Sequence, residues 1–165
     1  MSFPGLLVNG VAVDTVSVHD RGFQYGDGLF ETIAVHRGAP LLWERHMQRL
    51  AAGAVRLGMP PPETALLRAE ADQLCRGVER GALKIILTRG VSGRGYRSAA
   101  SVSTTRVLSL SPWPDYPPSW TREGVAVRLC QMRLASQPRL AGLKHLNRLE
   151  QVLARAEWDD EYAEG

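Results

Sequence analysis

Apolar and polar positions alternate in short blocks along the first part of the chain. Apolar residues flank Asn9-Gly10 on both sides, and this dipeptide between apolar runs predicts a β-hairpin. A polar, glycine-rich stretch follows at residues 19–28. Residues 29–36 are rich in β-branched and aromatic side chains and predict a strand, which ends in a turn at Arg37-Gly38.

Two amphipathic helices are predicted after this strand. Apolar side chains fall near one face of residues 43–57, and Gly58 with the prolines of residues 60–62 ends that helix. Residues 63–78 show the same helical spacing, and Gly81 closes the segment. Each helix therefore has an apolar face that must pack against a neighbouring element.

The middle of the chain predicts three further strands. Residues 82–88 form a near-continuous apolar run with a single charge, Lys84, which is typical of a buried strand. The other two strands are predicted at residues 107–110 and 125–129. A loop over residues 89–96 lies between the strand of residues 82–88 and that of residues 107–110. The strands and the helix pair together predict an α+β domain that covers about residues 1–130.

The helical and strand spacing is lost from Gln131 to Gly142, which predicts a linker between two units. Lys144 then opens a new helical pattern that runs to about Trp158. The apolar stripe of this expected helix needs a partner, and it consists of Leu146, Leu149, Val152 and Leu153.

Composition and charge exclude several classes of protein. With 44% hydrophobic and 22% charged residues, the 165-residue chain has the balance of an ordinary globular protein. The net charge is only +3 and the arginines are scattered, whereas nucleic-acid binders concentrate basic residues in a stripe. Neither a signal peptide nor a membrane-spanning stretch is apparent. Two cysteines, Cys75 and Cys130, form no CxxC pair and predict two buried thiols in the cytoplasm.

Residues 141–151 carry the most informative chemistry. A lysine among apolar neighbours at the start of a helix loses its proton more easily than an exposed lysine, because desolvation disfavours the ammonium form. The neutral amine of Lys144 could then attack an aldehyde and form a Schiff base. Spacing alone leaves open the alternative that Lys144 is a solvated lysine at a helix start.

Other chemistries find little support in the sequence. The segment Gly90–Arg94 around Ser92 lacks the second spaced glycine of a nucleophile elbow, and residues 159–161 form a solvated acidic run. No metal site is predicted, since no ligand spacing is shared by the four histidines, His19, His36, His46 and His145.

Four segments, in the same order along the chain, resemble motifs of one enzyme superfamily. They are Asp20–Thr32, His46–Leu50, Arg89–Tyr96 and Gly142–Leu153. The last is similar, almost residue by residue, to the cofactor-lysine motif of the aminodeoxychorismate lyases. These enzymes belong to the pyridoxal-phosphate (PLP) dependent, fold type IV superfamily that includes the branched-chain and D-amino acid aminotransferases. Any one segment alone would be weak support, and their common order makes the resemblance specific.

The resemblance implies a role for each matched position. Lys144 would hold PLP as a Schiff base and then move protons. Arg49 would contact the cofactor phosphate, for which the two parallel donors of a guanidinium are suited. Without the motif, the favoured interpretation of Arg49 would be a surface arginine on an amphipathic helix. The substrate side of the site would be formed by Arg94, Tyr96, Phe30 and Thr32.

The resemblance also implies a reaction and an assembly. The lyases remove pyruvate from 4-amino-4-deoxychorismate and give 4-aminobenzoate for folate, and a homodimer with the pocket near its interface is expected. The α+β domain would end near residue 130, residues 131–142 would be the interdomain linker, and residues 143–165 would begin a second, PLP-binding domain. In the superfamily that domain supplies an acidic partner for the pyridine nitrogen, and this sequence ends before the position of that partner. We therefore expect weak PLP binding and slow or no turnover from the 165-residue chain.

Two alternatives remain. Within the superfamily, the chain could belong to an aminotransferase for D- or branched-chain amino acids, although the amino-acid sequence of residues 144–150 favours the lyase. Outside enzymes, it could be a non-catalytic α+β fragment that self-associates through the apolar stripe of residues 146–153.

Overall fold

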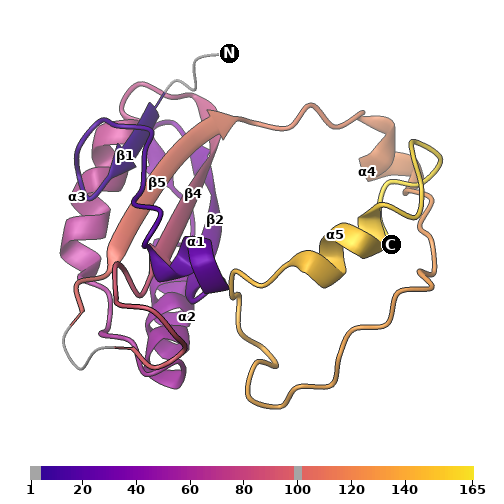
Figure 1. The fold of residues 1–165 in the computed structure, drawn as a ribbon. Helices are drawn as coiled ribbons and strands as arrows, with labels where there is room; N and C mark the ends of the chain where they lie inside the picture. Colours follow the sequence, from indigo (N-terminus) through magenta and orange to yellow (C-terminus); the bar gives the residue numbers. More distant parts are fainter. Residues whose placement is uncertain (1–4, 99–101) are drawn as a thin grey trace. The chain divides into compact units, whose positions relative to one another are not determined.

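A computed structural model describes residues 5–98 and 102–165 of the chain (Figure 1). It divides into two compact units. The first comprises Met1–Pro114 and Leu143–Leu146, and the second comprises Asp115–Gly142 and Asn147–Gly165. The short lysine segment 143–146 is therefore part of the first unit, although it is distant in sequence.

The first unit is built on an antiparallel sheet of five strands. Their order across the sheet is β1-β5-β4-β2-β3. The central strands β2 and β4 pair along their whole lengths, from Gly28 opposite Thr88 to His36 opposite Arg80. The strands are β1 (Gly5–Val8), β2 (Gly28–His36), β3 (Ala39–Pro40), β4 (Arg80–Thr88) and β5 (Thr105–Pro112).

Two helices cover one face of this sheet, α2 (Trp43–Arg56) and α3 (Thr64–Cys75) (Figure 1). The odd-numbered side chains of β2 point toward them and are buried, because successive side chains of a strand face opposite sides. The helix α2 packs close to the strand at Gly53, where a Cβ atom would lie 2.9 Å from Cδ1 of Leu29. The even-numbered side chains of β2, including Phe30 and Thr32, lie on the opposite face and are half-buried or exposed.

Two tight turns follow from residues with positive φ. Asn9 and Gly10 have φ values of 51° and 83°, and Arg37 and Gly38 have 48° and 76°. Two successive residues with positive φ suit the twist of flanking antiparallel strands. The turn at Arg37-Gly38 is confirmed. The Asn9-Gly10 turn is also confirmed, but the expected hairpin shrinks to one bridge between Val8 and Val11.

Most of the other predicted helices and strands are present in the structure, and one predicted strand is not. The two helices and the strands β2, β4 and β5 are confirmed, with ends that differ by a few residues. The strand expected at residues 125–129 is wrong, since only one bridge, from Val127 to Glu164, occurs there. Three short elements were not predicted: α1 (Arg21–Tyr25), β3 and α4 (Ser119–Glu123).

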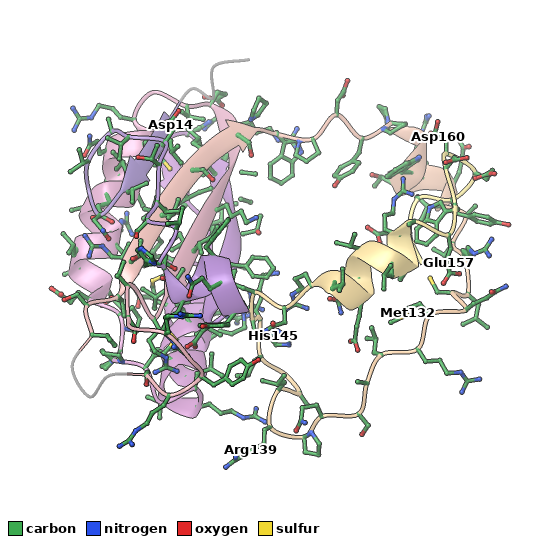
Figure 2. The ribbon with its side chains drawn as sticks, viewed as in Figure 1. Asp14, Met132, Arg139, His145, Glu157 and Asp160 are labelled. Atoms are coloured by element: carbon green, nitrogen blue, oxygen red, sulfur yellow. The ribbon has the colours of Figure 1, made fainter. Side chains whose placement is uncertain are left out.

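The second unit contains α4 and α5 (Leu149–Arg155). Glu157 organises its irregular segment, because its carboxylate accepts hydrogen bonds of 2.8 and 2.7 Å from the main-chain N–H groups of Gln131 and Met132 (Figure 2). A helix is expected from Lys144 to Trp158, but the observed helix α5 covers only Leu149–Arg155, so the expected length is wrong. Within the described unit, Leu149, Val152 and Leu153 are exposed.

Two remaining expectations concern cysteines and membranes. Cys75 is buried and Cys130 is half-buried, so the expectation of two buried thiols is correct only for Cys75. Both cysteines are free. No helix in the described residues is both long and apolar enough to cross a membrane.

Candidate functional site

Lys144 lies in an extended segment that runs along the first residues of β2. The N–H of Phe30 donates to the carbonyl of Lys144 at 2.9 Å, and the N–H of Leu146 donates to the carbonyl of Gly28 at 3.0 Å. An antiparallel bridge joins Leu29 to His145 between them. The expectation that Lys144 starts a helix is wrong, because its main chain pairs with a strand. His145 was expected on that helix and lies in the bridge instead.

Gly28 allows this segment to approach the sheet. A Cβ atom at Gly28 would lie 2.6 Å from the carbonyl oxygen of Leu87 and 2.8 Å from Cδ1 of Leu146. Both distances are shorter than non-bonded carbon contacts allow. A side chain at position 28 would therefore push away either β4 or the segment that carries the lysine.

The chain has two lysines, and the side-chain amines of both lie near the ring of Phe30. The Nζ atom of Lys144 lies 4.1 Å from the ring centroid, and Nζ of Lys84 lies 5.4 Å from it. Lys84 pairs in register with Thr32, so it shares the open face of the sheet with both Phe30 and Thr32. Attraction between a cation and the face of an aromatic ring holds each amine at this place.

Beside Phe30, Glu31 points to the opposite, helix-covered face and is fully buried. Its carboxylate accepts a hydrogen bond of 2.7 Å from Nε of Arg49 and a second from Nη2 of the same guanidinium. Nδ1 of His46 lies 2.7 Å from the same carboxylate and donates to it. His46 and Arg49 both lie on α2, so three charged or polar side chains join that helix to β2.

The partners of Glu31 keep it ionised. Burial raises the pKa of its carboxyl, but the hydrogen bonds from Arg49 and His46, together with their charges, outweigh burial and hold the pKa below its ordinary value. The Arg49 side chain remains half-exposed, whereas the Glu31 side chain is almost inaccessible to solvent. One edge of the guanidinium is thus anchored in the protein, while the group as a whole stays accessible.

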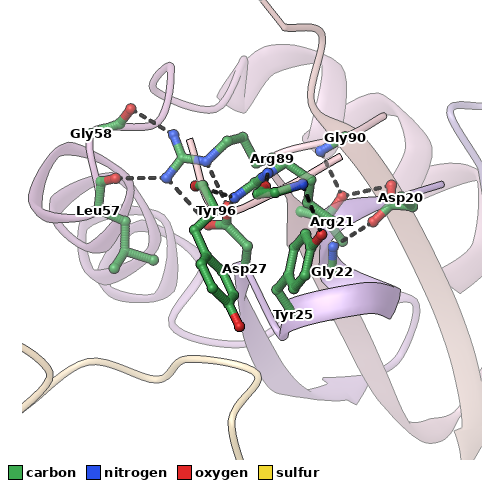
Figure 3. Close-up of polar contacts among 12 residues, drawn as sticks. Asp20, Arg21, Gly22, Tyr25, Asp27, Leu57, Gly58, Arg89, Gly90 and Tyr96 are labelled. Carbon is green, nitrogen blue, oxygen red and sulfur yellow. Dashed lines mark hydrogen bonds and ion pairs between the residues drawn. The ribbon is translucent and has the colours of Figure 1, made fainter. Parts of the chain in front are cut away.

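A second ion-pair cluster lies at the loop after β4 (Figure 3). Asp27 accepts hydrogen bonds of 2.8 Å from Nε of both Arg21 and Arg89. Arg21 also donates to the carbonyls of Gly95 and Tyr96, each at 2.9 Å. Arg21 therefore connects the glycine-rich stretch before β2 to the loop of residues 89–96.

A buried carboxylate fixes the start of this loop. Asp20 accepts a hydrogen bond of 2.8 Å from the hydroxyl of Thr88 and one of 2.7 Å from the N–H of Gly22 (Figure 3). The Thr88 hydroxyl in turn accepts from the N–H of Gly90 at 2.9 Å. Gly90 has a φ of 88°, and a Cβ atom there would lie 1.9 Å from the carbonyl oxygen of Ser103. Position 90 therefore requires glycine.

Arg94 and Tyr96 lie on this loop. Arg94 is exposed and borders an open depression of about 990 Å³ that Arg89 and Arg97 also line. The Tyr96 side chain is exposed, and its ring centroid lies 5.5 Å from that of Tyr25. The contacts described for these two residues do not include Lys144 or Phe30.

The structure thus brings together some of the predicted site residues. Lys144 and Phe30 are in contact, Thr32 follows on the same face, and Arg49 is tied to the neighbouring residue Glu31. Lys84 was predicted only as the charge in a buried strand. Glu31 was part of a motif but was assigned no role.

A signal for Glu31 exists in the sequence. The apolar neighbours at every second position of β2 place a carboxylate on the buried face, where it must find a cationic partner. Its partners cannot be read in the same way, because the pairing depends on how α2 crosses the strand.

Comparison with known proteins agrees with the motifs. The family profile described as Amino-transferase class IV matches residues 28–164. An aminodeoxychorismate lyase of Vibrio harveyi is 38% identical over 152 residues, which cover 92% of this chain and 56% of that protein. The structure of 4-amino-4-deoxychorismate lyase from Pseudomonas aeruginosa has 52% sequence identity and a TM-score of 0.90, over 96% of this chain and 58% of that one.

A PLP-bound hypothetical aminotransferase from Mycobacterium tuberculosis is also similar, with 26% identity and a TM-score of 0.71 over 92% of this chain and 58% of that one. The chain spans somewhat more than half the length of these relatives. The predicted α+β fold of the N-terminal part of these enzymes and the resemblance read from the motifs are both confirmed. The chain belongs to the aminotransferase class IV family.

Proposed function

We propose that the protein is a PLP-dependent lyase that converts 4-amino-4-deoxychorismate into 4-aminobenzoate and pyruvate, a step of folate biosynthesis. The observation that carries the proposal is the position of the Lys144 amine on the ring of Phe30, beside the strand residue that anchors Arg49. The relatives named as lyases, at 38% and 52% identity, support a lyase over an aminotransferase.

The residues present fit PLP. A primary amine held on an aromatic ring can bond to the cofactor aldehyde. A guanidinium with one edge tied to Glu31 leaves its remaining N–H groups for the phosphate. Lys144 contacts Phe30 and Arg49 is hydrogen-bonded to Glu31, and Phe30 and Glu31 are consecutive residues of β2.

When bound, PLP withdraws electrons from the carbon that carries the substrate nitrogen. In the proposed reaction, the Nζ atom of Lys144, once free, removes the proton from that carbon. The same amine, or an acid near it, then gives a proton to the enolpyruvyl group as the carbon–oxygen bond that joins this group to the ring breaks, and the group leaves as pyruvate. An aminotransferase would instead release a keto acid.

The substrate carries two carboxylates, and the open face of the sheet carries two lysine amines beside Phe30. Lys84 shares that face with Phe30 and Thr32 and is available to one carboxylate. Arg94 and Tyr96 belong to the loop that Arg21 holds, and we assign them to the substrate on the strength of their motif.

The proposal also includes the compartment, the oligomeric state and the domain boundaries of the protein. Two free cysteines are typical of a reducing compartment, which supports the cytoplasm. A homodimer follows from the family resemblance. The division into a domain over residues 1–130, a linker over residues 131–142 and the start of a PLP-binding domain at residue 143 also rests on that resemblance.

Reductive trapping with PLP tests the proposal. After borohydride treatment, peptide mapping should find the cofactor on Lys144, and Lys144→Arg should abolish the adduct. Lys84→Arg is the matched control, because Lys84 is the only other lysine and contacts the same ring. Labelling of Lys84 alone would overturn the assignment. A product assay then separates the reactions, since keto acid without 4-aminobenzoate would identify an aminotransferase.

A further inference from the structure

We propose that Glu31 is a positioning residue, which sets the affinity for the cofactor phosphate by fixing the guanidinium of Arg49. The inference rests on the proposed function, since it concerns the same cofactor. Glu31 is 0% exposed and does not itself face solvent, so it acts only through the side chains that it binds.

The geometry around Glu31 is that of an anchor. Arg49 donates to both carboxylate oxygens, through Nε to Oε1 and through Nη2 to Oε2. His46 donates to Oε2 from one turn earlier on the same helix. The carboxylate is therefore held from two sides, and its own rotation is restricted.

Such an anchor changes what Arg49 can do. An unanchored arginine on a helix surface samples many rotamers, and ordering it costs side-chain entropy. The Arg49 side chain is 51% exposed, so without Glu31 it would have this freedom. With the inner edge bound, less entropy is lost when the remaining N–H groups bind a phosphate.

Positioning and charge predict opposite changes in phosphate affinity when the Glu31 carboxylate is removed. The Glu31 carboxylate also cancels part of the positive charge of Arg49, which weakens attraction to a phosphate. If charge dominated, removal of the carboxylate would strengthen phosphate binding. If positioning dominates, as we infer from the two-point contact, the same change weakens phosphate binding.

The experiment compares two aldehydes that differ only in the phosphate, PLP and pyridoxal. Dissociation constants are measured for both with the unmodified protein and with Glu31→Gln, which keeps the shape but removes the charge. We expect the affinity for PLP to fall about ten-fold, while the affinity for pyridoxal stays within about two-fold. A purely structural role would lower both affinities together.

Glu70→Gln is the matched control. Glu70 is also a buried carboxylate in a two-point pair, with Arg106, but it joins α3 to β5 rather than α2 to β2. Its loss should reduce stability without changing the ratio of the two affinities. A double-mutant cycle with Arg49→Lys completes the design, because Glu31→Gln should have little further effect on PLP once the guanidinium is absent.

Each outcome decides the matter. Equal losses for PLP and pyridoxal, no loss, or a gain for PLP would overturn the role of Glu31 while leaving the proposed function intact. Absence of a Lys144 adduct in the unmodified protein would overturn both. If Glu31→Gln does not fold, His46→Gln takes its place, and a selective loss of about three-fold for PLP is expected, since Glu31 then keeps only one partner. An unchanged ratio in that variant would equally refute the proposal.

Discussion

The amine of Lys144 lies 4.1 Å from the ring centroid of Phe30, and the N–H of Phe30 donates to the carbonyl of Lys144 at 2.9 Å. The two residues are thus joined through both main chain and side chain. The main-chain bond survives any substitution at position 30 except proline, so the contribution of the ring can be tested alone.

Replacing Phe30 with Leu removes the ring and keeps an apolar side chain on the strand. A contact between a cation and an aromatic ring contributes about 0.5–1 kcal/mol at an accessible site, so Lys144 should become more mobile and form its PLP adduct about three-fold less readily. Stopped-flow absorbance measures the rate of adduct formation. Phe30→Tyr keeps the ring and should behave as the unmodified protein, and a loss of the same size there would refute the explanation.

Asp27→Asn should destabilise the first unit and loosen the loop after β4. Asp27 is shared by Arg21 and Arg89, whose side chains are largely buried, and its replacement leaves two guanidinium groups facing a neutral amide. Breaking a buried ion pair in this way costs about 3 kcal/mol. Urea unfolding gives the free energy, and limited trypsin digestion should cut faster at Arg94.

The control for Asp27→Asn is Glu79→Gln, which breaks an exposed pair with Arg37. An exposed pair contributes about 0–1 kcal/mol, so this variant should unfold close to the unmodified protein. Equal destabilisation by the two variants would show that the cluster at Asp27 has no special role.

Acid should unfold the first unit in a defined window. The pKa of Asp27 is also lowered: burial raises it, but hydrogen bonds and charges from Arg89 and Arg21 outweigh burial. For Asp27 and Glu31 the stabilisation is complete above the ordinary values of 3.8 and 4.5 and is lost as the pH falls through the lower values of the folded state. The unfolded chain binds more protons there, so the free energy of unfolding falls.

Urea midpoints between about pH 6 and pH 3 measure this dependence. Glu31→Gln should flatten the acid slope, because one of the two shifted carboxyls is then absent. An unchanged slope would mean that other groups govern acid unfolding.

The two cysteines should differ in reactivity. Burial, assisted by the charge of Asp72, raises the pKa of the Cys75 thiol to about 11, so little thiolate forms near neutral pH. Cys130 is half-buried and accessible. Iodoacetamide should therefore label Cys130 first, as mass spectrometry of digested protein can show, and both should react in urea. Faster labelling of Cys75 in the folded protein would contradict the core position.

The sequence was most informative where a local pattern decides the structure. The β-branched and aromatic residues of positions 29–36 predict β2, and helical spacing in residues 43–57 predicts α2, because these preferences are local. The tight turn at Arg37-Gly38 follows equally from local backbone preferences. Motif order also identified Lys144 and Phe30, which the structure brings into contact.

Pairings between distant segments could not be predicted in this way. Helical spacing after Lys144 suggested a helix, but β2 provides hydrogen-bond partners for the segment and keeps it extended. Residues 125–129 look like a strand, yet a strand needs a neighbour, and only Val127 has one in the described structure. The salt bridges of Glu31 and Asp27 depend likewise on how separate elements cross.

The lysine segment also protects an edge. Toward its beginning, β2 has β4 on one side, while β3 pairs only with Val35 and His36 at the far end. Residues 144–146 fill the other side there, by accepting from Phe30 and donating to Gly28. A polypeptide cut just before Leu143 would expose these two groups to any extended strand, including one from another molecule. Lys144, which we propose as the Schiff-base residue, thus lies in a segment that also covers an edge of the sheet.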